Sequence, residues 1–366
     1  MRYNSQGLKR DVALQIVGVS KHQYYYTSKK TKQGMKTSTT TSKDDGTEVD
    51  NKEIVLKIKE LKRDQCTQYG YQKTSRWLQQ EGFFINKKKV YRLMKSHQLL
   101  QEKRPKSERV YAKYRKVLPE APLHLLEMDI KMTWIESVKK HVYTLTLIDT
   151  FTRVVLHRIT QYSIKKMDVK RFWDDVIIHH LQPEDCLKNK FEIEIRNDND
   201  KRFSAQVIQD YFKENHLNQV FTHPYTPQEN GHIESFHAIL SKYLAPYLFW
   251  DLDELETHLK TFYQKYNYER LHSSVANLSP MNFWKLYKRG FIDKKVDLKN
   301  RKINFKLNIP YQNVRKLTGK IEPEGSSLHD FEKIEIYKKR GSALRASHNL
   351  RYKKSPSVVP CNAKIK

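Results

Sequence analysis

Three apolar, β-branched runs follow one another from Leu123 onward, and this pattern restricts the fold of the chain more than any other feature. The runs are LHLLEMDIKMTW, HVYTLTLIDTF and RVVLHRIT, with short polar breaks between them. Such runs predict a three-strand meander. A helix over Ile164 to His180 is expected next, then the strand FEIEIRN, the helix SAQVIQDYFKENH, the strand NQVFTH and a long helix from near His232. This order predicts an α/β fold, with a mixed sheet flanked by helices.

Three carboxylates occupy positions that this topology brings together. Asp129 lies on the first strand among apolar residues, where an unpaired charge is costly. Asp198 follows the strand FEIEI, and Glu234 lies in the first turn of the helix after the loop PYTPQENG. Two strand ends and one helix start meet at one edge of such a sheet. We therefore expect the three side chains to form a cluster.

Clustered carboxylates repel one another, so the cluster needs cations. Mg²⁺ is a hard divalent cation that prefers oxygen ligands, and Mn²⁺ is an alternative. Two ions roughly 3.5 to 4 Å apart can clamp the attacking and leaving oxygens of a phosphoryl displacement, which breaks or joins phosphodiesters. The nucleophile is then water or a DNA 3′-hydroxyl, so no Ser, Cys or His nucleophile is required. Taken singly, each carboxylate has a simpler explanation as a turn former or a partner of the helix dipole.

Several motifs surround these carboxylates, namely MDIKMTW, LIDTFTRVV, RNDNDKRF, HPYTPQENGHIESFHAIL and YNYERLHSSVANLSPMNFW. Residues 199 to 233 put 35 residues between Asp198 and Glu234. In this order and at this spacing, the motifs resemble those of DDE transposases of the retroviral-integrase superfamily, the bacterial insertion-sequence transposases with an integrase catalytic core. The resemblance implies a ribonuclease-H-like core over residues 121–290 with Asp129, Asp198 and Glu234 as catalytic and metal-binding triad. It also implies nicking of transposon ends and strand transfer into target DNA.

Some positions depart from the family pattern or need a separate interpretation. Asp200 stands where the family usually has Gly, and its carboxylate either joins the metal site or caps the turn. Ser241 stands where many members carry a basic residue that holds DNA, and Lys242 follows it, rotated by roughly 100° around the helix. Asp149 is interpreted as a turn residue or a neighbour of the triad. Gly231 is expected to permit a close backbone approach.

The net charge of +28 is concentrated outside the predicted core. Residues 1–120 hold 28 basic and 12 acidic side chains, residues 121–290 hold 22 of each, and residues 291–366 hold 19 and 7. A neutral centre with basic flanks predicts a catalytic core served by modules that hold double-stranded DNA. A generally Lys-rich proteome is the simpler alternative, but it would not leave the centre neutral.

Helical units are predicted before the core. Residues 1–30, with LQIVGVSKHQYYY, indicate a helix-turn-helix, and residues 31–51, rich in Ser, Thr and Lys, indicate a flexible linker.

Residues 52–118 are predicted to form a second helical DNA-binding domain. In its last helix, Asn86 is the expected N-cap, and a basic face is free for DNA phosphates. That face consists of Lys87, Lys88, Lys89 and Arg92. A solvated basic face on an ordinary helix is the alternative for each of them.

Residues 295–350 alternate apolar and polar side chains and predict a small β-barrel, and residues 351–366 form a basic tail. A late motif contains Tyr266, Asn267, Arg270 and His272, which the resemblance indicates to be structural or DNA-contacting. Lys242, Arg270 and His272 are our predicted DNA contacts in the core.

The chain has no apolar stretch near the roughly 18 residues of a membrane span, and its polar start lacks the core of a signal peptide. Cys66, Cys186 and Cys361 stand apart, without a zinc-binding or disulfide pattern. We expect a cytoplasmic, nucleoid-associated bacterial protein without a membrane partner.

The leading hypothesis is a Mg²⁺-dependent transposase that acts as a homodimer or higher oligomer when both element ends are held together. One alternative is a structure-selective nuclease on the same fold. Another is a catalytically weakened or repurposed DNA-binding protein, suggested by Asp200 and Ser241.

Overall fold

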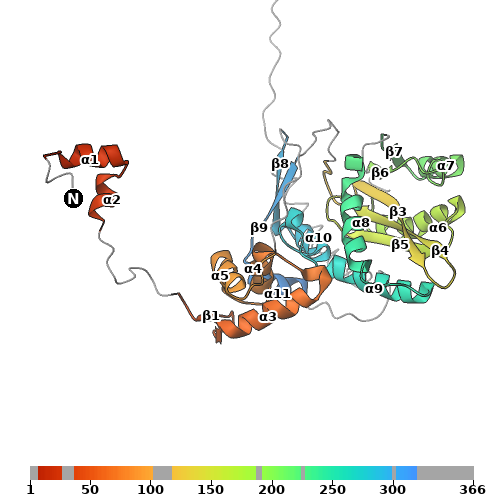
Figure 1. Cartoon of the computed structure of the whole chain (residues 1–366). Coiled ribbons are helices and arrows are strands. Elements are labelled where there is room, and N and C mark those ends of the chain that lie inside the picture. The colour runs from red at the N-terminus through yellow and green to blue at the C-terminus, as the bar shows by residue number, and fades with distance from the viewer. Residues whose placement is uncertain are drawn as a thin grey trace, which may run out of the picture.

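A five-stranded mixed sheet forms the centre of the computed structural model (Figure 1), which describes residues 7–26, 37–101, 118–186, 192–223, 227–298 and 302–319. The sheet order is β5-β4-β3-β6-β7. The strands are β3 (Leu125–Ile135), β4 (Lys140–Asp149), β5 (Val155–Gln161), β6 (Ile193–Asn197) and β7 (Leu217–Phe221). β3, β4 and β5 are antiparallel neighbours, whereas β6 runs parallel to β3 and to β7. The predicted meander and mixed α/β sheet are therefore confirmed.

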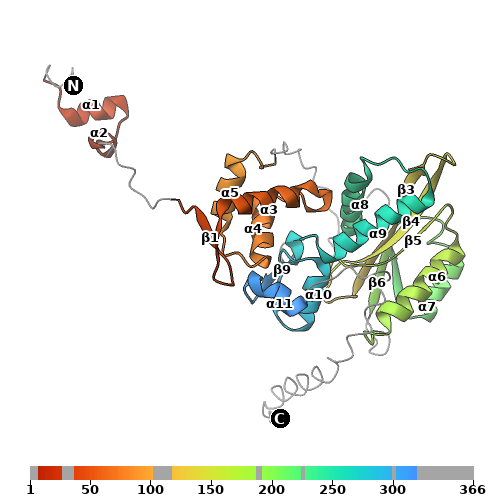
Figure 2. The same ribbon diagram turned by 90° about the horizontal axis from the view of Figure 1, so that it is seen from below.

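Helices cover both faces of this sheet (Figure 2). On one face lie α6 (Lys166–Val176), continued by the π-helical turn η3 (Ile177–Leu181), and α7 (Gln206–Glu214). On the other lie α8 (Gly231–Leu244) and α9 (Leu252–Tyr268). Side chains alternate between faces along a strand, and in β4 Leu145 and Leu147 pack on the first face while Val142 and Ile148 pack on the second. Both faces of the sheet are thus largely apolar and buried, with the fully buried carboxylate of Glu127 on β3 as an exception.

A helical domain with its own core precedes the sheet. It contains α3 (Asn51–Arg63), the 3-10 turn η2 (Gln65–Thr67), α4 (Tyr71–Gln80) and α5 (Lys87–Ser96). Its core includes Ile54, Ile58, Leu78, Phe83, Val90 and Met94. The side chain of Asn86 accepts a hydrogen bond from the Lys89 amide at 2.8 Å, so the predicted N-cap of α5 is confirmed.

Part of the predicted linker, residues 31–51, is a β-hairpin instead. β1 (Thr40–Ser42) pairs antiparallel with β2 (Glu48–Asp50). The turn between them is ordered by Asp45, whose Oδ1 accepts from the Thr47 amide at 2.9 Å, and by Gly46 at φ 84°. The amide of Phe84 also donates to the Ser42 carbonyl, so the hairpin docks on the helical domain. Threonine favours strands, and composition alone misread this segment as a linker.

The first helices are α1 (Arg10–Val17) and α2 (Lys21–Tyr25). Gly18 between them has φ 67°, and Ser20 forms a capping box with Gln23, as a helix pair broken at Gly18 predicts. Whether the pair acts as a helix-turn-helix stays a prediction.

After α9 and the 3-10 turn η5 (Ser273–Val275), the chain forms α10 (Pro280–Lys288), then the antiparallel pair β8 (Ile292–Asp297) and β9 (Lys302–Leu307), then η6 (Tyr311–Asn313) and α11 (Val314–Thr318). Of the barrel predicted over 295–350, the structure describes residues 295–298 and 302–319, which form most of this hairpin, then η6 and the helix α11. The strand FEKIEIYKK and the tail 351–366 lie outside them. Within the described ranges, no helix combines the length and apolarity needed to cross a bilayer.

Candidate active site

The parallel pairing of β3 and β6 brings two of the predicted carboxylates to the same level of the sheet. Glu127 on β3 is the register partner of Arg196 on β6. Asp129 comes two residues after Glu127 on β3, and Asp198 comes two residues after Arg196, one residue beyond the end of β6. Asp129 is half-buried on β3, whereas Asp198 is exposed just beyond the end of β6.

The third carboxylate reaches this edge because Glu127 holds α8 against β3. The Glu127 side chain is fully buried, and its Oε2 accepts hydrogen bonds from the backbone amides of His232 at 3.0 Å and Ile233 at 2.9 Å. These amides belong to the first turn of α8, which has no intrahelical partner for them. The imidazole Nδ1 of His232 donates to Glu127 Oε1 at 2.7 Å. The first turn of α8, which carries Glu234, is therefore joined to β3 two residues before Asp129.

A second link between α8 and β3 comes from His237. Its Nδ1 lies 3.2 Å from Oδ2 of Asp129, while Oδ1 of Asp129 accepts from the Ile130 amide at 2.7 Å. His237 follows Glu234 by three residues, so the two side chains lie on neighbouring positions of one helix side. The other ring nitrogen, Nε2, is buried without a hydrogen-bond partner among the described residues.

The three carboxylates interact electrostatically. Partial burial and the charges of Asp129 and Glu127 raise the pKa of Glu234 above its ordinary value. Burial, followed by the charges of Asp129 and Asp200, raises the pKa of Asp198, although a hydrogen bond from the Asp200 amide opposes the shift. Asp129 is the residue common to both interactions. The negative charge of Asp129 therefore disfavours ionisation of both other carboxylates.

The chemistry of the three side chains suits a hard divalent cation, because all three offer carboxylate oxygens. Their positions do not yet form a metal site, because no three His, Cys, Asp or Glu side chains of the described residues lie close enough together to hold a metal ion. Asp198 and Glu234 are exposed, so their side chains have room to change rotamer. The relative positions of the β3, β6 and α8 backbones determine how closely the three carboxylates can approach one another.

Three other predictions about this region can be compared with the structure. Asp200 pairs with Arg202, whose amide and Nε donate to Oδ1 at 2.8 Å each, so its carboxylate caps the turn. Asp149 is fully buried and accepts from the amides of Phe151 and Thr152 at 3.1 Å, so it is a turn residue. Among the described residues, a Cβ at Gly231 would meet no atom within 4 Å, so none of them makes the close backbone approach expected there.

The predicted DNA-contacting residues of α5 fall into two pairs. Lys87 and Lys88 are exposed and make no hydrogen bond to other described residues. Lys89 instead donates to Ser38 Oγ at 3.1 Å, and Arg92 donates to the Ser38 carbonyl at 3.2 Å. Lys89 and Arg92 therefore hold the segment before β1 in place. The sequence did not predict these contacts, because that segment was interpreted as a linker.

The late motif has a largely structural arrangement. The amide group of Asn267 bonds both the N–H and the carbonyl of Val155 at 2.9 Å, which fastens α9 to β5. Tyr266 packs edge-on against Phe236 with ring centroids 4.7 Å apart. Burial and nearby cations hold the pKa of His272 well below its ordinary value, so its imidazole is neutral. Lys242 is exposed at the end of α8, and Arg270 lies across a cavity from it.

Sequence reasoning missed Glu127 and His237. A signal for Glu127 was present, since a carboxylate between Leu126 and Met128 in an apolar strand must find partners inside the fold. For His237, the signal was its helical spacing from Glu234. Neither partner could be named without the tertiary structure.

Comparisons with known proteins agree with the motifs. Residues 215–280 match a family described as Integrase core domain, and residues 48–107 match one described as HTH-like domain. The chain is 24% identical over 217 residues to a 39.2 kDa protein of insertion element IS476 from Xanthomonas euvesicatoria, covering 59% of this chain and 60% of that protein. It is 23% identical over 245 residues to the Escherichia coli K12 protein named "Putative transposase InsK for insertion sequence element IS150", covering 63% and 82%.

A chain of the simian T-cell lymphotropic virus intasome shares 17% identity and a TM-score of 0.38, over 56% of this chain and 67% of that chain. The resemblance to insertion-sequence transposases with an integrase core is confirmed by the family and relative matches.

Proposed function

We propose that this protein is a transposase that cuts DNA at the ends of an insertion sequence and joins those ends to target DNA. The observation that carries the proposal is the attachment of the first turn of α8, which bears Glu234, to β3 two residues before Asp129, with Asp198 one residue beyond the end of the neighbouring strand β6. The matches to an integrase core and to insertion-element proteins support it. A ribonuclease-H-like core over residues 121–290 is part of the same proposal.

Asp129, Asp198 and Glu234 would hold Mg²⁺, with Mn²⁺ as a substitute and two ions per site. Bound there, the cations would supply charge stabilisation to the attacking and leaving oxygens of the phosphodiester. The protein's own part is positional. Glu127 aligns the first turn of α8, and His237 orients the carboxylate of Asp129.

DNA is the proposed partner because of the charge of +28 and the match of residues 48–107 to an HTH-like domain. Lys87 and Lys88 are the best-placed phosphate contacts of α5, because both are exposed. In the core, Lys242 and Arg270 would contact the duplex, whereas the neutral His272 would act through packing. Two element ends require two catalytic centres, so we propose at least a dimer.

A cleavage and joining assay tests the proposal. The purified full chain would be mixed with Mg²⁺ and a labelled duplex taken from the inverted repeats that flank the coding sequence. We expect nicked and joined products, both abolished by Glu234→Gln while DNA binding is retained. Glu60→Gln, an exposed carboxylate on α3, is the matched control and should keep both activities. Nicking without joining would favour a nuclease, and binding without either product would favour a repurposed DNA-binding protein.

A further inference from the structure

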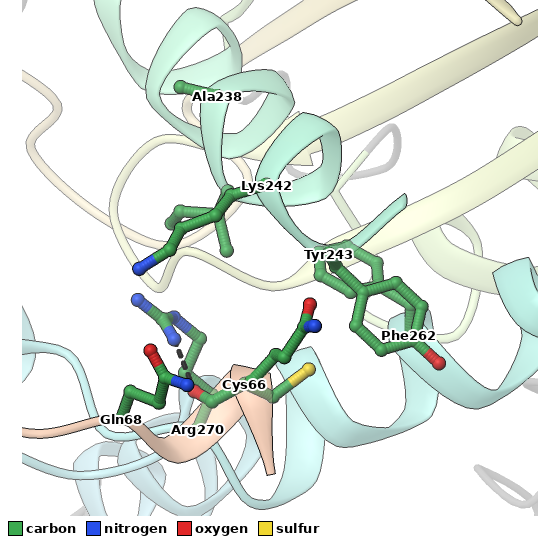
Figure 3. A pocket seen from close by; sticks show the side chains of 9 residues that line it. Cys66, Gln68, Ala238, Lys242, Tyr243, Phe262 and Arg270 are labelled. Atoms are coloured by element: carbon green, nitrogen blue, oxygen red, sulfur yellow. Dashed lines mark hydrogen bonds between the residues drawn. The ribbon is translucent and has the colours of Figure 1, made fainter. Parts of the chain in front are cut away.

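A cavity of about 170 Å³ lies where the helical domain meets the last turns of α8 (Figure 3). The helical domain contributes Cys66 and Gln68 to its walls. The core contributes Ala238 and Lys242 from α8, and Arg270 from the segment after α9. The cavity is therefore shared by the two parts of the protein that match an HTH-like domain and an integrase core.

Two cations face this cavity without an acidic partner. The Lys242 ammonium and the Arg270 guanidinium point toward one another across the space (Figure 3). Arg270 Nη1 donates to the carbonyl of Cys66, but its Nε is buried and has no hydrogen-bond partner among the described residues. Lys242 forms no ion pair within the described ranges. No Asp or Glu belongs to the residues that line the cavity.

Other ionisable groups near the cavity carry both signs, since the charges of Asp64 and Glu269 also act on the Cys66 thiol, and Asp64 is paired with Lys265. Burial raises the pKa of the Cys66 thiol to about 12, and burial also raises the pKa of Tyr243, so both stay protonated at neutral pH. Lys73 on α4 does not line the cavity, but the charge of Arg270, after burial, lowers its pKa to about 8. Two cations that face each other with no acidic group in the cavity wall are costly, and an anion between them removes that cost.

Size and position indicate which anion fits. The volume lies below the roughly 300 to 1,000 Å³ of small-molecule sites, and it would hold about five waters or one phosphate group. Arg and Lys are the usual donors to phosphate oxygens. Lys242 follows Glu234 by eight residues, which is about 80° around α8 and roughly 12 Å along its axis. At 3.4 Å per nucleotide, that is about three to four nucleotides of one DNA strand.

We propose that this cavity binds one backbone phosphate of a DNA duplex lying along α8, between Lys242 and Arg270, and that the bound phosphate fixes the helical domain against the catalytic helix. The proposal rests on the proposed function, from which it takes DNA as the ligand and Lys242 and Arg270 as contacts of the core. It goes further by assigning one phosphate, three to four nucleotides from the scissile bond, to a site that both parts of the protein build.

DNA binding without divalent metal tests the proposal, because no cleavage then interferes. The full chain and its Lys242→Gln variant would be titrated with the flanking inverted-repeat duplex over a range of KCl concentrations. Loss of one phosphate contact should reduce the slope of log K against log salt by about 0.9. Lys242→Arg should restore the slope. Lys260→Gln, an exposed cation on α9, is the matched control for loss of one charge and should leave the slope unchanged.

A second arm locates the phosphate. Duplexes with a single neutral methylphosphonate, moved one position at a time, should show one position that weakens wild-type binding and has no effect on Lys242→Gln. Identical scans for both proteins, or an equal change of slope in Lys260→Gln, would overturn the proposal. Failure of the wild type to bind the duplex would overturn it together with the proposed function. Binding with the expected scan but no cleavage in Mg²⁺ would reject the proposed transposase alone.

Discussion

The imidazole of His232 donates to the buried carboxylate of Glu127 at 2.7 Å, and the backbone amide of the same residue donates to it at 3.0 Å. The Glu127 side chain on β3 thus accepts two hydrogen bonds from His232 at the start of α8, and a third from the amide of Ile233. Hydrogen bonds to a buried charged acceptor are short and stronger than neutral ones. The orientation of the proposed catalytic helix therefore depends on a residue outside the triad.

Glu127→Gln should destabilise the core, because one acceptor oxygen becomes an NH₂ group that faces donors. We expect a loss of about 1 to 3 kcal/mol in the free energy of unfolding, from the cost of unsatisfied buried donors. The midpoint of urea denaturation measures it, with Glu60→Gln as the control. In cleavage assays below the transition, kcat should fall more than KM changes. An unchanged midpoint would contradict the arrangement at the start of α8.

Asp198→Asn and Asp200→Asn form a matched pair on one turn. We expect Asp198→Asn to abolish cleavage, because Asp198 is one of the carboxylates coupled to Asp129. Asp200→Asn should retain cleavage within a few-fold, because that carboxylate is engaged by Arg202. Single-turnover cleavage of labelled duplex measures both. If Asp200→Asn were as inactive as Asp198→Asn, the additional carboxylate would belong to the metal site after all.

Ser241→Lys should strengthen DNA binding. Position 241 is exposed on the same side of α8 as Glu234, and Ser241 makes only a hydrogen bond to the His237 carbonyl one turn earlier. An added cation there should raise duplex affinity and steepen its salt dependence by about one phosphate contact. The free energy of unfolding should change by no more than about 0.5 kcal/mol, as for other surface substitutions. Fluorescence titration at several KCl concentrations provides the measurement, and unaltered affinity would place the duplex away from α8.

Lys73 predicts a pH dependence of stability. Burial, then the charge of Arg270, lowers its folded pKa from 10.5 to about 8. Between these values the unfolded chain binds more protons than the folded one, so stability contributed through Lys73 rises as pH increases from about 8 to about 10.5. Lys73→Met lacks this contribution. It should therefore be more stable than the wild type at pH 7, by a margin that shrinks toward pH 10.

Thermal denaturation from pH 7 to 10 tests the Lys73 prediction, with Lys57→Met on α3 as the control for the loss of one exposed charge. A constant difference between Lys73→Met and the wild type across this range would show that Lys73 is not desolvated beside Arg270.

Much of the fold was predictable because it follows from local patterns. The β-branched runs of β3, β4 and β5 alternate faces and are buried on both, so they read clearly as strands. Asn86 and Ser20 are N-caps whose chemistry is contained within three or four residues. The hairpin at β1 and β2 was missed because it depends on docking against residues after α4, some 40 positions later in the chain.

For the candidate site, the sequence alone determined which carboxylates are available, where they stand on strands and a helix, and which family they resemble. Only the tertiary structure decided what surrounds them. The parallel pairing of β3 and β6 put Asp198 just beyond the end of the strand next to the one that carries Asp129, and the buried acceptor Glu127 set the direction of α8. The space between Lys242 and Arg270 likewise exists only because the helical domain packs against α8. These contacts arise from burial and from pairing between segments that are far apart in the chain, and a local sequence pattern specifies neither.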